Sequence, residues 1–317
     1  MAKIAVVGAG PMGLTVSYRL LKMGHQVTLF EADSIIGGMS ASFDFDGVKI
    51  ERFYHFLCRS DYPLFDLLRD LGIEESLRWQ DTYMGYYWKK ATRDWGDPFA
   101  LLRFPDLSLL SKVRYGLMAF TSTKRSNWKK LDGVDAVSWL KNWVGQEAYD
   151  VLWKPLFELK FHQYTDNLSA AWIWSRLKRV GSSRRHLLQE SLGYLDGGSD
   201  TFLYRIKDAI EDLSGDIRLS TPVKKITINN GKITGINTEQ GYESFDRVVS
   251  TVPLPYVPDM LEDLPETTLE RYRSVENIAV VCVLAKLKKP LSKYFWLNVS
   301  DETMDIPGVV EYTRLRP

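Results

Sequence analysis

The residue pattern best suited to chemistry is a glycine-rich turn near the N-terminus, which reads Gly8-Ala9-Gly10-Pro11-Met12-Gly13. Glycine at the first position permits a tight exit from a strand. At the second position it lets a pyrophosphate approach the backbone, and at the third it lets a helix pack closely on a sheet. A helix N-terminus also offers N–H groups and a partial positive charge to phosphates. The pattern predicts a dinucleotide-binding turn, provided that a strand precedes it and a helix follows.

The flanking sequence predicts that strand and that helix. Residues 3–7 are a short β-branched run typical of a buried parallel strand, residues 11–23 are expected to form a helix, and residues 26–30 a second strand. Glu31 follows the second strand, where an acid accepts hydrogen bonds from ribose hydroxyls and repels the 2′-phosphate of NADP. We therefore expect residues 3–40 to form a Rossmann-type βαβ unit that binds the ADP half of a dinucleotide.

A second glycine pair indicates which dinucleotide binds. Six residues after Glu31 the chain reads Gly37-Gly38-Met39-Ser40. The two motifs in this order resemble those of the FAD-dependent amine oxidase superfamily, in the branch of the protoporphyrinogen oxidases and phytoene desaturases. The resemblance implies FAD as the cofactor, held by residues 8–13, Glu31, Ala32 and residues 37–40. Met39 departs from the family, which usually has Arg there, and so removes a cation expected near the pyrophosphate.

Later segments extend the resemblance. Residues 47–55 look like the family's segment that runs back toward the isoalloxazine ring, which implies that Tyr54 and His55 lie near the flavin or the substrate. A hydrogen-bonded core histidine is the alternative interpretation of His55. Gly197-Gly198-Ser199 resembles the family's second glycine turn, where the chain re-enters the FAD-binding domain.

Two more segments resemble family strands that line the cofactor. Thr221-Pro222-Val223 is similar to the strand whose valine backbone contacts the adenine, which implies Val223 as a contact. Residues 246–253 resemble the strand that ends in a small residue and a proline beside the cofactor, which implies Thr251 and Pro253. Together with residues 3–40, these segments make the resemblance extend over nearly the whole chain.

The spacing of apolar residues predicts the elements between these segments. Most of residues 62–186 show the period of helices. Residues 224–228 and 232–238 alternate as strands around Asn229-Asn230-Gly231, and an Asn-Gly pair between such runs is a strong hairpin signal. A helix is expected over residues 199–213, and strands are expected over residues 246–252, 278–287 and 308–312.

These expectations define an α/β fold in which a Rossmann-type FAD-binding domain is interrupted by a mainly helical substrate domain with an additional β-sheet. The FAD-binding domain is expected over residues 1–60 and 190–255, and the substrate domain over residues 61–189 and 256–317. Relatives usually continue to a glycine-rich segment whose helix faces the flavin. This sequence ends at Pro317 without one, so the C-terminal part of the substrate domain is expected to be incomplete.

Composition excludes several classes of protein. The 317 residues include 41 basic and 40 acidic side chains, so charge gives no support for nucleic-acid binding by the whole chain. Two distant cysteines and four scattered histidines predict neither a disulfide framework nor a metal site. No run approaches the ~20 apolar residues that span a bilayer. The expected location is therefore the cytoplasm.

Two basic clusters, within residues 124–130 and 176–186, qualify that expectation. Each is either a solvated face or a contact for an anionic lipid surface or a phosphorylated substrate. The expected partner is a small-molecule or lipid-like substrate, and peripheral membrane contact stays open. The sequence predicts no oligomeric state.

The resemblance implies an FAD-dependent oxidoreductase that passes a hydride from a C–N or C–C bond of an organic substrate to flavin N5. One alternative is a non-redox isomerase that resembles UDP-galactopyranose mutase, with a basic pocket from residues 176–185 for a nucleotide-sugar diphosphate. The other is a non-catalytic FAD-binding module. No Ser/His/Asp, Cys/His or paired-carboxylate pattern stands out, so the sequence predicts no catalytic side chain.

Overall fold

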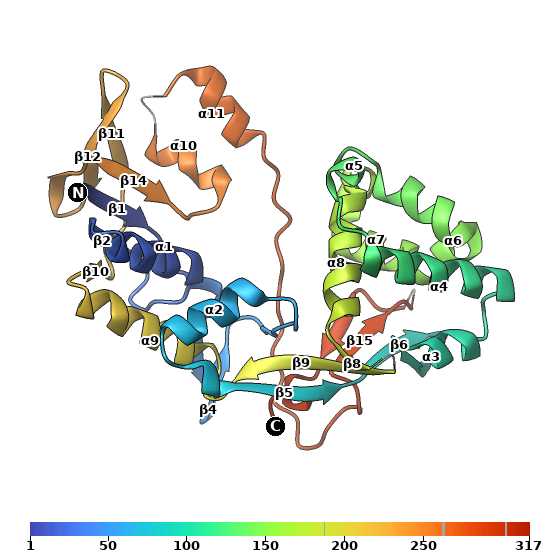
Figure 1. Ribbon diagram of the computed structural model, residues 1–317. Helices are drawn as coiled ribbons and strands as arrows, with labels where there is room; N and C mark the ends of the chain where they lie inside the picture. Colours follow the sequence, from blue (N-terminus) through green and yellow to red (C-terminus); the bar gives the residue numbers. More distant parts are fainter. Residues whose placement is uncertain (187, 262–263, 302) are drawn as a thin grey trace. The chain divides into compact units, whose positions relative to one another are not determined.

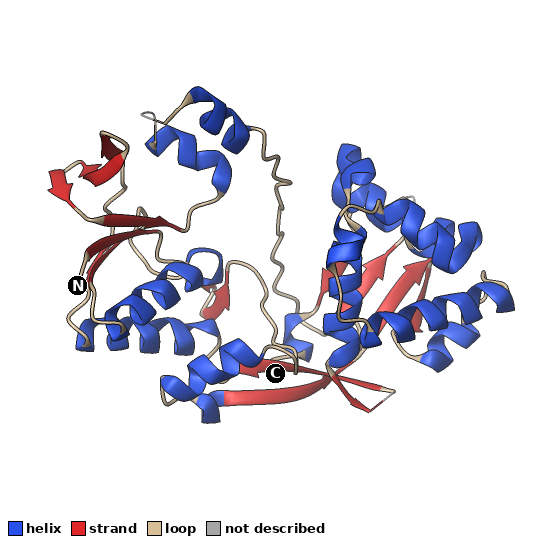
Figure 2. Ribbon diagram, turned by 45° about the horizontal axis from the view of Figure 1, so that its top comes forward, coloured by secondary structure: helices blue, strands red, loops and turns tan. Residues whose placement is uncertain are grey.

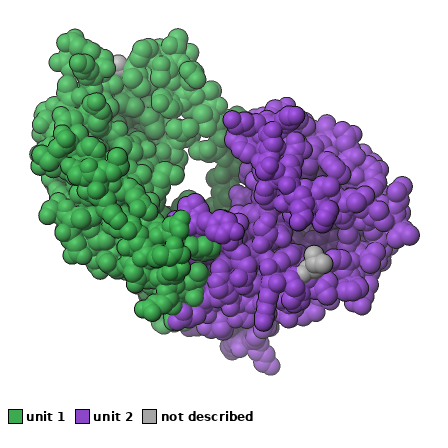
Figure 3. Space-filling model, viewed as in Figure 1, with its two compact units in different colours: residues 1–55, 64–77, 195–283 green, residues 56–63, 78–194, 284–317 purple. Residues whose placement is uncertain are grey.

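The computed structural model describes residues 1–186, 188–261, 264–301 and 303–317. These residues divide into two compact units, which are coloured separately in Figure 3. Unit 1 contains residues 1–55, 64–77 and 195–283, and unit 2 contains residues 56–63, 78–194 and 284–317. The chain therefore passes from unit 1 to unit 2 after residues 55, 77 and 283, returns to unit 1 after residues 63 and 194, and ends in unit 2.

Unit 1 is built on a four-stranded sheet in the order β10-β2-β1-β14, with all neighbours parallel (Figure 1). Its central strand β1 is buried along most of its length, as expected of a parallel sheet that is covered on both faces. The predicted βαβ unit is confirmed. The elements are β1 (Lys3–Val7), α1 (Pro11–Lys22), β2 (Gln26–Phe30), α9 (Ser199–Asp212), β10 (Asp216–Arg218) and β14 (Arg247–Ser250).

A three-stranded antiparallel sheet, β11-β12-β13, joins this core. Asn229 pairs with Lys232, so Asn230 and Gly231 form a two-residue turn in which both have positive φ. This geometry confirms the predicted hairpin. The other elements assigned here are η1 (Gly38–Ser40), β3 (Ser42–Phe45), β4 (Val48–Glu51), α2 (Tyr62–Asp70), η2 (Glu74–Ser76), β11 (Lys225–Asn229), β12 (Lys232–Thr238), β13 (Gly241–Ser244), η4 (Leu254–Tyr256), α10 (Val257–Met260) and α11 (Glu266–Arg273).

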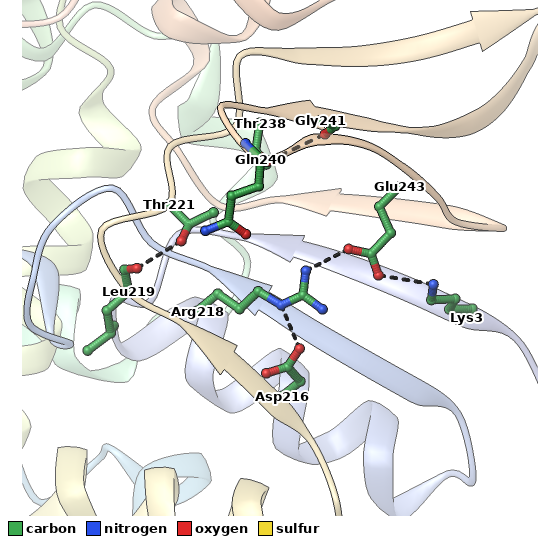
Figure 4. A network of polar contacts seen from close by, with 9 residues as sticks. All are labelled: Lys3, Asp216, Arg218, Leu219, Thr221, Thr238, Gln240, Gly241 and Glu243. Atoms are coloured by element: carbon green, nitrogen blue, oxygen red, sulfur yellow. Dashed lines mark hydrogen bonds and ion pairs between the residues drawn. The ribbon is translucent and has the colours of Figure 1, made fainter.

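A polar network fastens the edge of the parallel sheet to the antiparallel one (Figure 4). The Arg218 guanidinium donates to Asp216 Oδ2 and to Glu243 Oε2, at 2.6 Å each. Glu243 also accepts from Lys3 Nζ at 3.0 Å. Hydrogen bonds from these partners lower the pKa of the Glu243 carboxyl, against the effect of its partial burial, which is the largest contribution and raises it.

Unit 2 combines two sheets with a group of helices (Figure 2). One sheet has the order β16-β15-β6-β7 and the other β5-β9-β8. The strands are β5 (Leu77–Thr82), β6 (Met84–Trp88), β7 (Ala91–Trp95), β8 (Arg184–His186), β9 (Gln189–Leu195), β15 (Trp296–Val299) and β16 (Gly308–Val310). The helices are α3 (Pro98–Arg103), α4 (Leu109–Lys124), α5 (Lys129–Asp132), α6 (Ala136–Leu152), α7 (Lys154–Phe161), η3 (His162–Asn167), α8 (Ala170–Ser182) and η5 (Tyr312–Arg314).

Aromatic side chains fill the core between these helices and strand β6. Phe157 is buried and packs edge-to-face on Tyr149, Trp153 and Phe161. Such pairs add about 0.5–1.5 kcal/mol beyond the burial of their area. Aromatic residues make up 13% of the chain, and many of them therefore serve packing in unit 2.

Two predictions of secondary structure are wrong. Residues 77–95, which were included in the helical region, form strands β5, β6 and β7. Residues 278–287, predicted as a strand, have no regular structure, and Val281 and Val283 are 88% and 86% exposed. A strand needs a neighbour for its N–H and C=O groups, and no strand in the described part of the chain forms a sheet with this segment. No helix in the described part of the chain is long and apolar enough to cross a membrane.

Candidate FAD-binding site

The first glycine turn is held so tightly that two of its glycines cannot be replaced without movement. Gly8 has φ +102°, and a Cβ there would lie 2.7 Å from Thr251 Oγ1. A Cβ at Gly13 would lie 1.8 Å from the carbonyl oxygen of Gly8. The backbones of β1 and α1 therefore approach within a distance that a side chain would prevent, as the sequence predicts.

The N-terminus of α1 is left open. Gly10 is the N-cap, no side chain caps the helix, and a Cβ on Gly10 would meet nothing within 4 Å. Met12, in the first turn, is exposed. The first N–H groups of α1 and the space beside Gly10 thus form a cradle of the kind that receives a phosphate.

Glu31 lies directly beside this turn. Its Oε2 accepts from Ala9 N at 2.6 Å, and its Oε1 accepts from Asp33 N at 2.9 Å. Its backbone N–H donates to Arg218 O at 2.9 Å. Because a carboxylate offers about four acceptor positions, these bonds hold Glu31 in place and leave it capacity for ribose hydroxyls.

The second glycine pair packs against the first turn. Gly37 has φ +112° and donates to Ala9 O at 2.8 Å, and a Cβ on Gly38 would lie 3.4 Å from the Gly10 Cα. Met39 is 62% exposed, and Ala32 is exposed as well. The two glycine motifs therefore form one continuous backbone surface.

The later predicted contacts return to the same region. Thr251 follows β14 and donates through N and Oγ1 to Val7 O, at 2.9 Å each. Val223 packs on the core cluster that contains Ala5 and Val7. Pro253 is exposed two residues beyond Thr251. Of the three, Thr251 directly touches the glycine turn.

A hydrogen-bonded chain of three side chains was not predicted from the sequence. Glu51 Oε2 lies 3.0 Å from His55 Nδ1, and His55 Nε2 lies 3.2 Å from Ser40 Oγ. Glu51 is buried, and its Oε1 accepts from Ser199 N at the start of α9, at 2.8 Å. We call Glu51, His55 and Ser40 the relay. It joins the Gly37–Gly38 turn to the Gly197–Gly198 turn.

The relay also fixes the tautomer of its histidine. A carboxylate can only accept, so His55 Nδ1 carries the proton and a neutral His55 accepts from the Ser40 hydroxyl at Nε2. Tyr54, the other predicted substrate-facing residue, is half-buried. Glu51 and His55 are four residues apart in the sequence. This spacing brings side chains together on a helix, but Glu51 is the last residue of strand β4, so the sequence alone does not predict their contact.

Several basic side chains of the two predicted clusters, which lie in unit 2, each contact a different group. Arg179 pairs with Asp61 at 2.8 Å, and Lys178 donates to Arg125 O at 2.6 Å. Arg184 donates to Gly96 O. Burial raises the pKa of the Cys58 thiol in this unit to about 11, so it is not a reactive thiolate at neutral pH. The described residues contain no group of three or more His, Cys, Asp or Glu that could hold a metal ion.

The backbone surface of unit 1 fits FAD. The cradle at Gly10, the open start of α1 and the acid at Glu31 match the needs of a pyrophosphate and a ribose. Comparison with known proteins agrees with this assignment. Residues 13–315 match the model of the flavin containing amine oxidoreductase family.

Three similar proteins illustrate the match. A zeta-carotene desaturase from Synechocystis sp. is 25% identical over 315 residues, which cover 89% of this chain and 63% of the relative. The structure of a putative protoporphyrinogen oxidase from Exiguobacterium sp. 255-15 superposes with a TM-score of 0.70 at 19% identity, over 99% of this chain and 73% of the other. A UDP-galactopyranose mutase structure reaches 0.69 at 18% identity, over 99% and 70%.

The family match extends over nearly all of the sequence, so the chain belongs to the flavin containing amine oxidoreductase family. The predicted α/β flavoprotein fold and the predicted cofactor, FAD, are confirmed. The chain spans 63% and 60% of the length of the first two curated relatives that it matches.

Proposed function

We propose that this chain acts in an FAD-dependent oxidoreductase that takes a hydride from an organic substrate. The observation that carries the proposal is the joined surface of two glycine turns, in which Gly38 approaches Gly10 beside the uncapped start of α1. Family membership supports the redox class, because the matched family is one of flavin containing oxidoreductases.

The residues of unit 1 bind and orient the cofactor. Residues 8–13 and 37–40, with Ala32, line the pyrophosphate, Glu31 takes the ribose, and Val223, Thr251 and Pro253 complete the nucleotide pocket. FAD, once bound, supplies the hydride acceptor. His55 and Tyr54 face the flavin or the substrate, and the relay keeps a proton on His55 Nδ1.

A spectrum tests the cofactor site. The purified 317-residue chain should be yellow or should become so with added FAD, and a colourless protein that fails to bind FAD would contradict the site. Glu31→Ala should weaken FAD by the ~1.5–3 kcal/mol of hydrogen bonds to a charged group. Glu239→Ala, on the exposed β12–β13 turn of the same unit, is the matched control.

The substrate class is a small or lipid-like organic molecule. The name of the zeta-carotene desaturase favours testing polyenes beside amines and tetrapyrroles. Mixing each compound with the flavin-loaded chain without oxygen should bleach the flavin spectrum for the true class. Bleaching by none of them, in a chain that holds FAD, favours the non-catalytic FAD-binding module.

A non-redox isomerase is the second candidate, favoured by the likeness to the UDP-galactopyranose mutase structure. Lys178, Arg179 and Arg184 each bind a different group, so these three residues do not form one basic pocket for a nucleotide-sugar diphosphate. UDP-galactopyranose and UDP-galactofuranose should therefore bind weakly and stay unconverted. Flavin-dependent interconversion of these two UDP-sugars would favour the isomerase over the oxidoreductase.

Helix α4 carries a surface that suits peripheral contact with an anionic membrane. Leu109, Val113, Leu117 and Phe120 recur on one face and are 50–70% exposed. Lys124 lies over the Phe120 ring, and Arg125, Lys129 and Lys130 follow. Apolar side chains beside lysines suit insertion among acidic headgroups. This surface supports the membrane contact that the sequence left open.

Vesicle sedimentation tests this contact. The chain should sediment with vesicles that contain phosphatidylserine and stay in solution with neutral phosphatidylcholine, and Leu117→Glu should abolish the difference. Met23→Glu places the same charge at an exposed apolar residue of unit 1 and should change nothing. Equal behaviour with both lipids would contradict the proposal.

A further inference from the structure

The nucleotide-binding loop is short of positive charge. Residues 8–13 contain no charged side chain, and residues 31–40 contain two acids, Glu31 and Asp33, and no Lys or Arg. Met39 stands where a cation was expected. A pyrophosphate brings further negative charge to this surface, so a cation from another part of the chain would strengthen its binding beyond what the start of α1 supplies.

Arg52 reaches this loop from the end of the β3–β4 hairpin. Its backbone N–H donates to Ala41 O at 2.9 Å. Its Nη1 donates to Gly38 O at 3.3 Å, and its Nη2 donates to Asp33 Oδ2 at 2.7 Å. One residue thus holds the loop at three points, one of which is the second glycine of the Gly37–Gly38 turn.

The positive charge of Arg52 also acts on an acidic residue of the loop. Its hydrogen bond lowers the pKa of the Asp33 carboxyl, so Asp33 is ionised beside it at neutral pH. The guanidinium has five N–H donors, and its side chain is 38% exposed. The two loop contacts use two donors, which leaves others for phosphate oxygens.

We propose that Arg52 supplies the cation that position 39 lacks and contacts the FAD pyrophosphate at the Gly38 turn. The proposal rests on FAD binding by unit 1, and it adds a binding residue to that site. A Cβ on Gly38 would lie 3.4 Å from the Gly10 Cα. Gly38, whose carbonyl accepts from Arg52, is therefore the residue of the second turn that contacts the open cradle. An arginine is suited to the role because its planar fork matches phosphate geometry.

The competing role for Arg52 is a brace that only shapes the loop. The two roles differ in which part of the ligand they affect. A pyrophosphate contact acts on FAD and ADP and leaves adenosine unaffected, because adenosine has no phosphate. A brace acts on all three, because the loop also holds Glu31.

The experiment measures the Kd of FAD by flavin fluorescence, and those of ADP and adenosine by competition or calorimetry. Arg52→Gln should weaken FAD and ADP by about 10- to 100-fold, as expected for a lost charge-assisted bond, and leave adenosine within twofold. Arg52→Gln with Met39→Arg should recover at least tenfold of the loss. Arg19→Gln, which removes a paired surface arginine at the far end of α1, should change nothing.

Two further variants separate charge from folding. Asp33→Asn removes the ionic partner and keeps the Arg52 charge, so FAD should bind as tightly as before or tighter. Arg52→Lys keeps a charge without the fork, and should lose less affinity than Arg52→Gln at low salt. Circular dichroism checks that each variant is folded, and if Arg52→Gln is not, Arg52→Lys and Asp33→Asn decide.

Several results would overturn the proposal. These are equal losses for adenosine and ADP, no recovery with Met39→Arg, or an unchanged FAD affinity in Arg52→Gln. Weaker binding in Asp33→Asn would favour the brace. A parent chain that binds neither ADP nor FAD would overturn the FAD site itself, together with this proposal.

Discussion

The helices of the two units begin in different ways. In unit 2, four helices start at an Asp or Ser whose side chain accepts a backbone N–H from the first turn; these caps are Asp97, Ser108, Asp135 and Ser169. In unit 1, α1 and α9 start at Gly10 and Gly198, and neither glycine can cap with a side chain. A side-chain cap stabilises a helix by about 1 kcal/mol relative to alanine but by only a few tenths of a kcal/mol relative to glycine, so unit 1 gives up little stability at these two starts.

The difference reflects what each helix start serves. A capped start is closed to other partners, which suits the helices of a packed core. Under the proposed function the start of α1 keeps its N–H groups for phosphates, whereas Ser199 N, in the first turn of α9, donates to Glu51 of the relay. These two helix starts of unit 1 therefore leave backbone N–H groups for other partners, whereas the four capped starts of unit 2 satisfy such groups with side chains.

The largest effect expected from this contrast is at Gly13. Gly13→Ala should cost about 4 kcal/mol or more in unfolding free energy, because its Cβ would overlap Gly8 O. Gly10→Ala is the matched variant, since its φ of −69° suits alanine and its Cβ meets nothing. It should fold normally and bind FAD weakly, because its methyl group enters the phosphate cradle. Thermal melts and FAD titration of both variants check this, and equal stability would contradict it.

A large effect of another kind is expected in the core of unit 2. Phe157→Ala should cost about 3–5 kcal/mol of stability, because Phe157 is buried among three aromatic rings. Denaturant melts measure it, with Phe120→Ala as an exposed control. Loss of FAD affinity in a folded Phe157→Ala protein would break the division between ligand binding and packing.

A moderate effect is expected at a single cap. Asp135→Ala should cost about 0.5–2 kcal/mol, since Asp135 Oδ2 accepts from Ser138 N at 2.7 Å. Asp135→Asn keeps an acceptor and should recover most of this loss. If denaturant melts give no difference between the parent and Asp135→Ala, the caps of unit 2 are not a source of its stability.

The smallest effect concerns buried carboxyls. Glu51 in unit 1 has partners on both oxygens, whereas Glu190 in unit 2 accepts from Thr82 and its Oε2 has no partner among the described residues. Burial raises the pKa of Glu190 above its ordinary value of 4.5. The folded state then holds the proton more tightly than the unfolded state, so stability falls as pH rises above that value and through the raised pKa.

Glu190→Gln should remove this fall and stabilise the protein at neutral pH, with little change at pH 4. Melts of Glu190→Gln across pH 4–8, beside those of the exposed Glu239→Gln, measure it. Parallel pH curves for Glu190→Gln and the parent protein would show that Glu190 ionises normally in the fold.

The sequence predicted the backbone of the glycine turns and the elements around them well, because their signals are local. The glycines at residues 8, 10 and 13 indicate a tight turn and a close approach of the backbone, and Asn230-Gly231 indicates a hairpin turn. The helix of residues 199–213 and the strands of the hairpin agree with the structure within a residue or two. All of the predicted contacts with the cofactor, and the substrate-facing roles of Tyr54 and His55, stay predictions.

What the sequence did not reveal depends on distant partners. The relay needs Ser40 to reach His55, and its contact with α9 needs Ser199 to reach Glu51; no local spacing encodes either contact. The aromatic residues of β6 favour a strand, but the helical spacing of the sequence on either side of β5–β7 led to a helical prediction for the whole region. Residues 278–287 have the alternation of a strand, but pairing with a neighbour decides whether a strand forms.

The pairing of β1 with β14 has a consequence for synthesis of the chain. Lys3 and Asp246, which hydrogen-bond beside this pair, are 243 residues apart. At about 5–20 residues per second the ribosome needs roughly 12–50 s to make the intervening segment. During that time the edge of β1 is exposed to strands of other nascent chains. Slower growth at low temperature lengthens this exposure, whereas a chaperone that covers residues 3–30 shortens it, so soluble yield should respond to chaperone supply more than to inducer concentration.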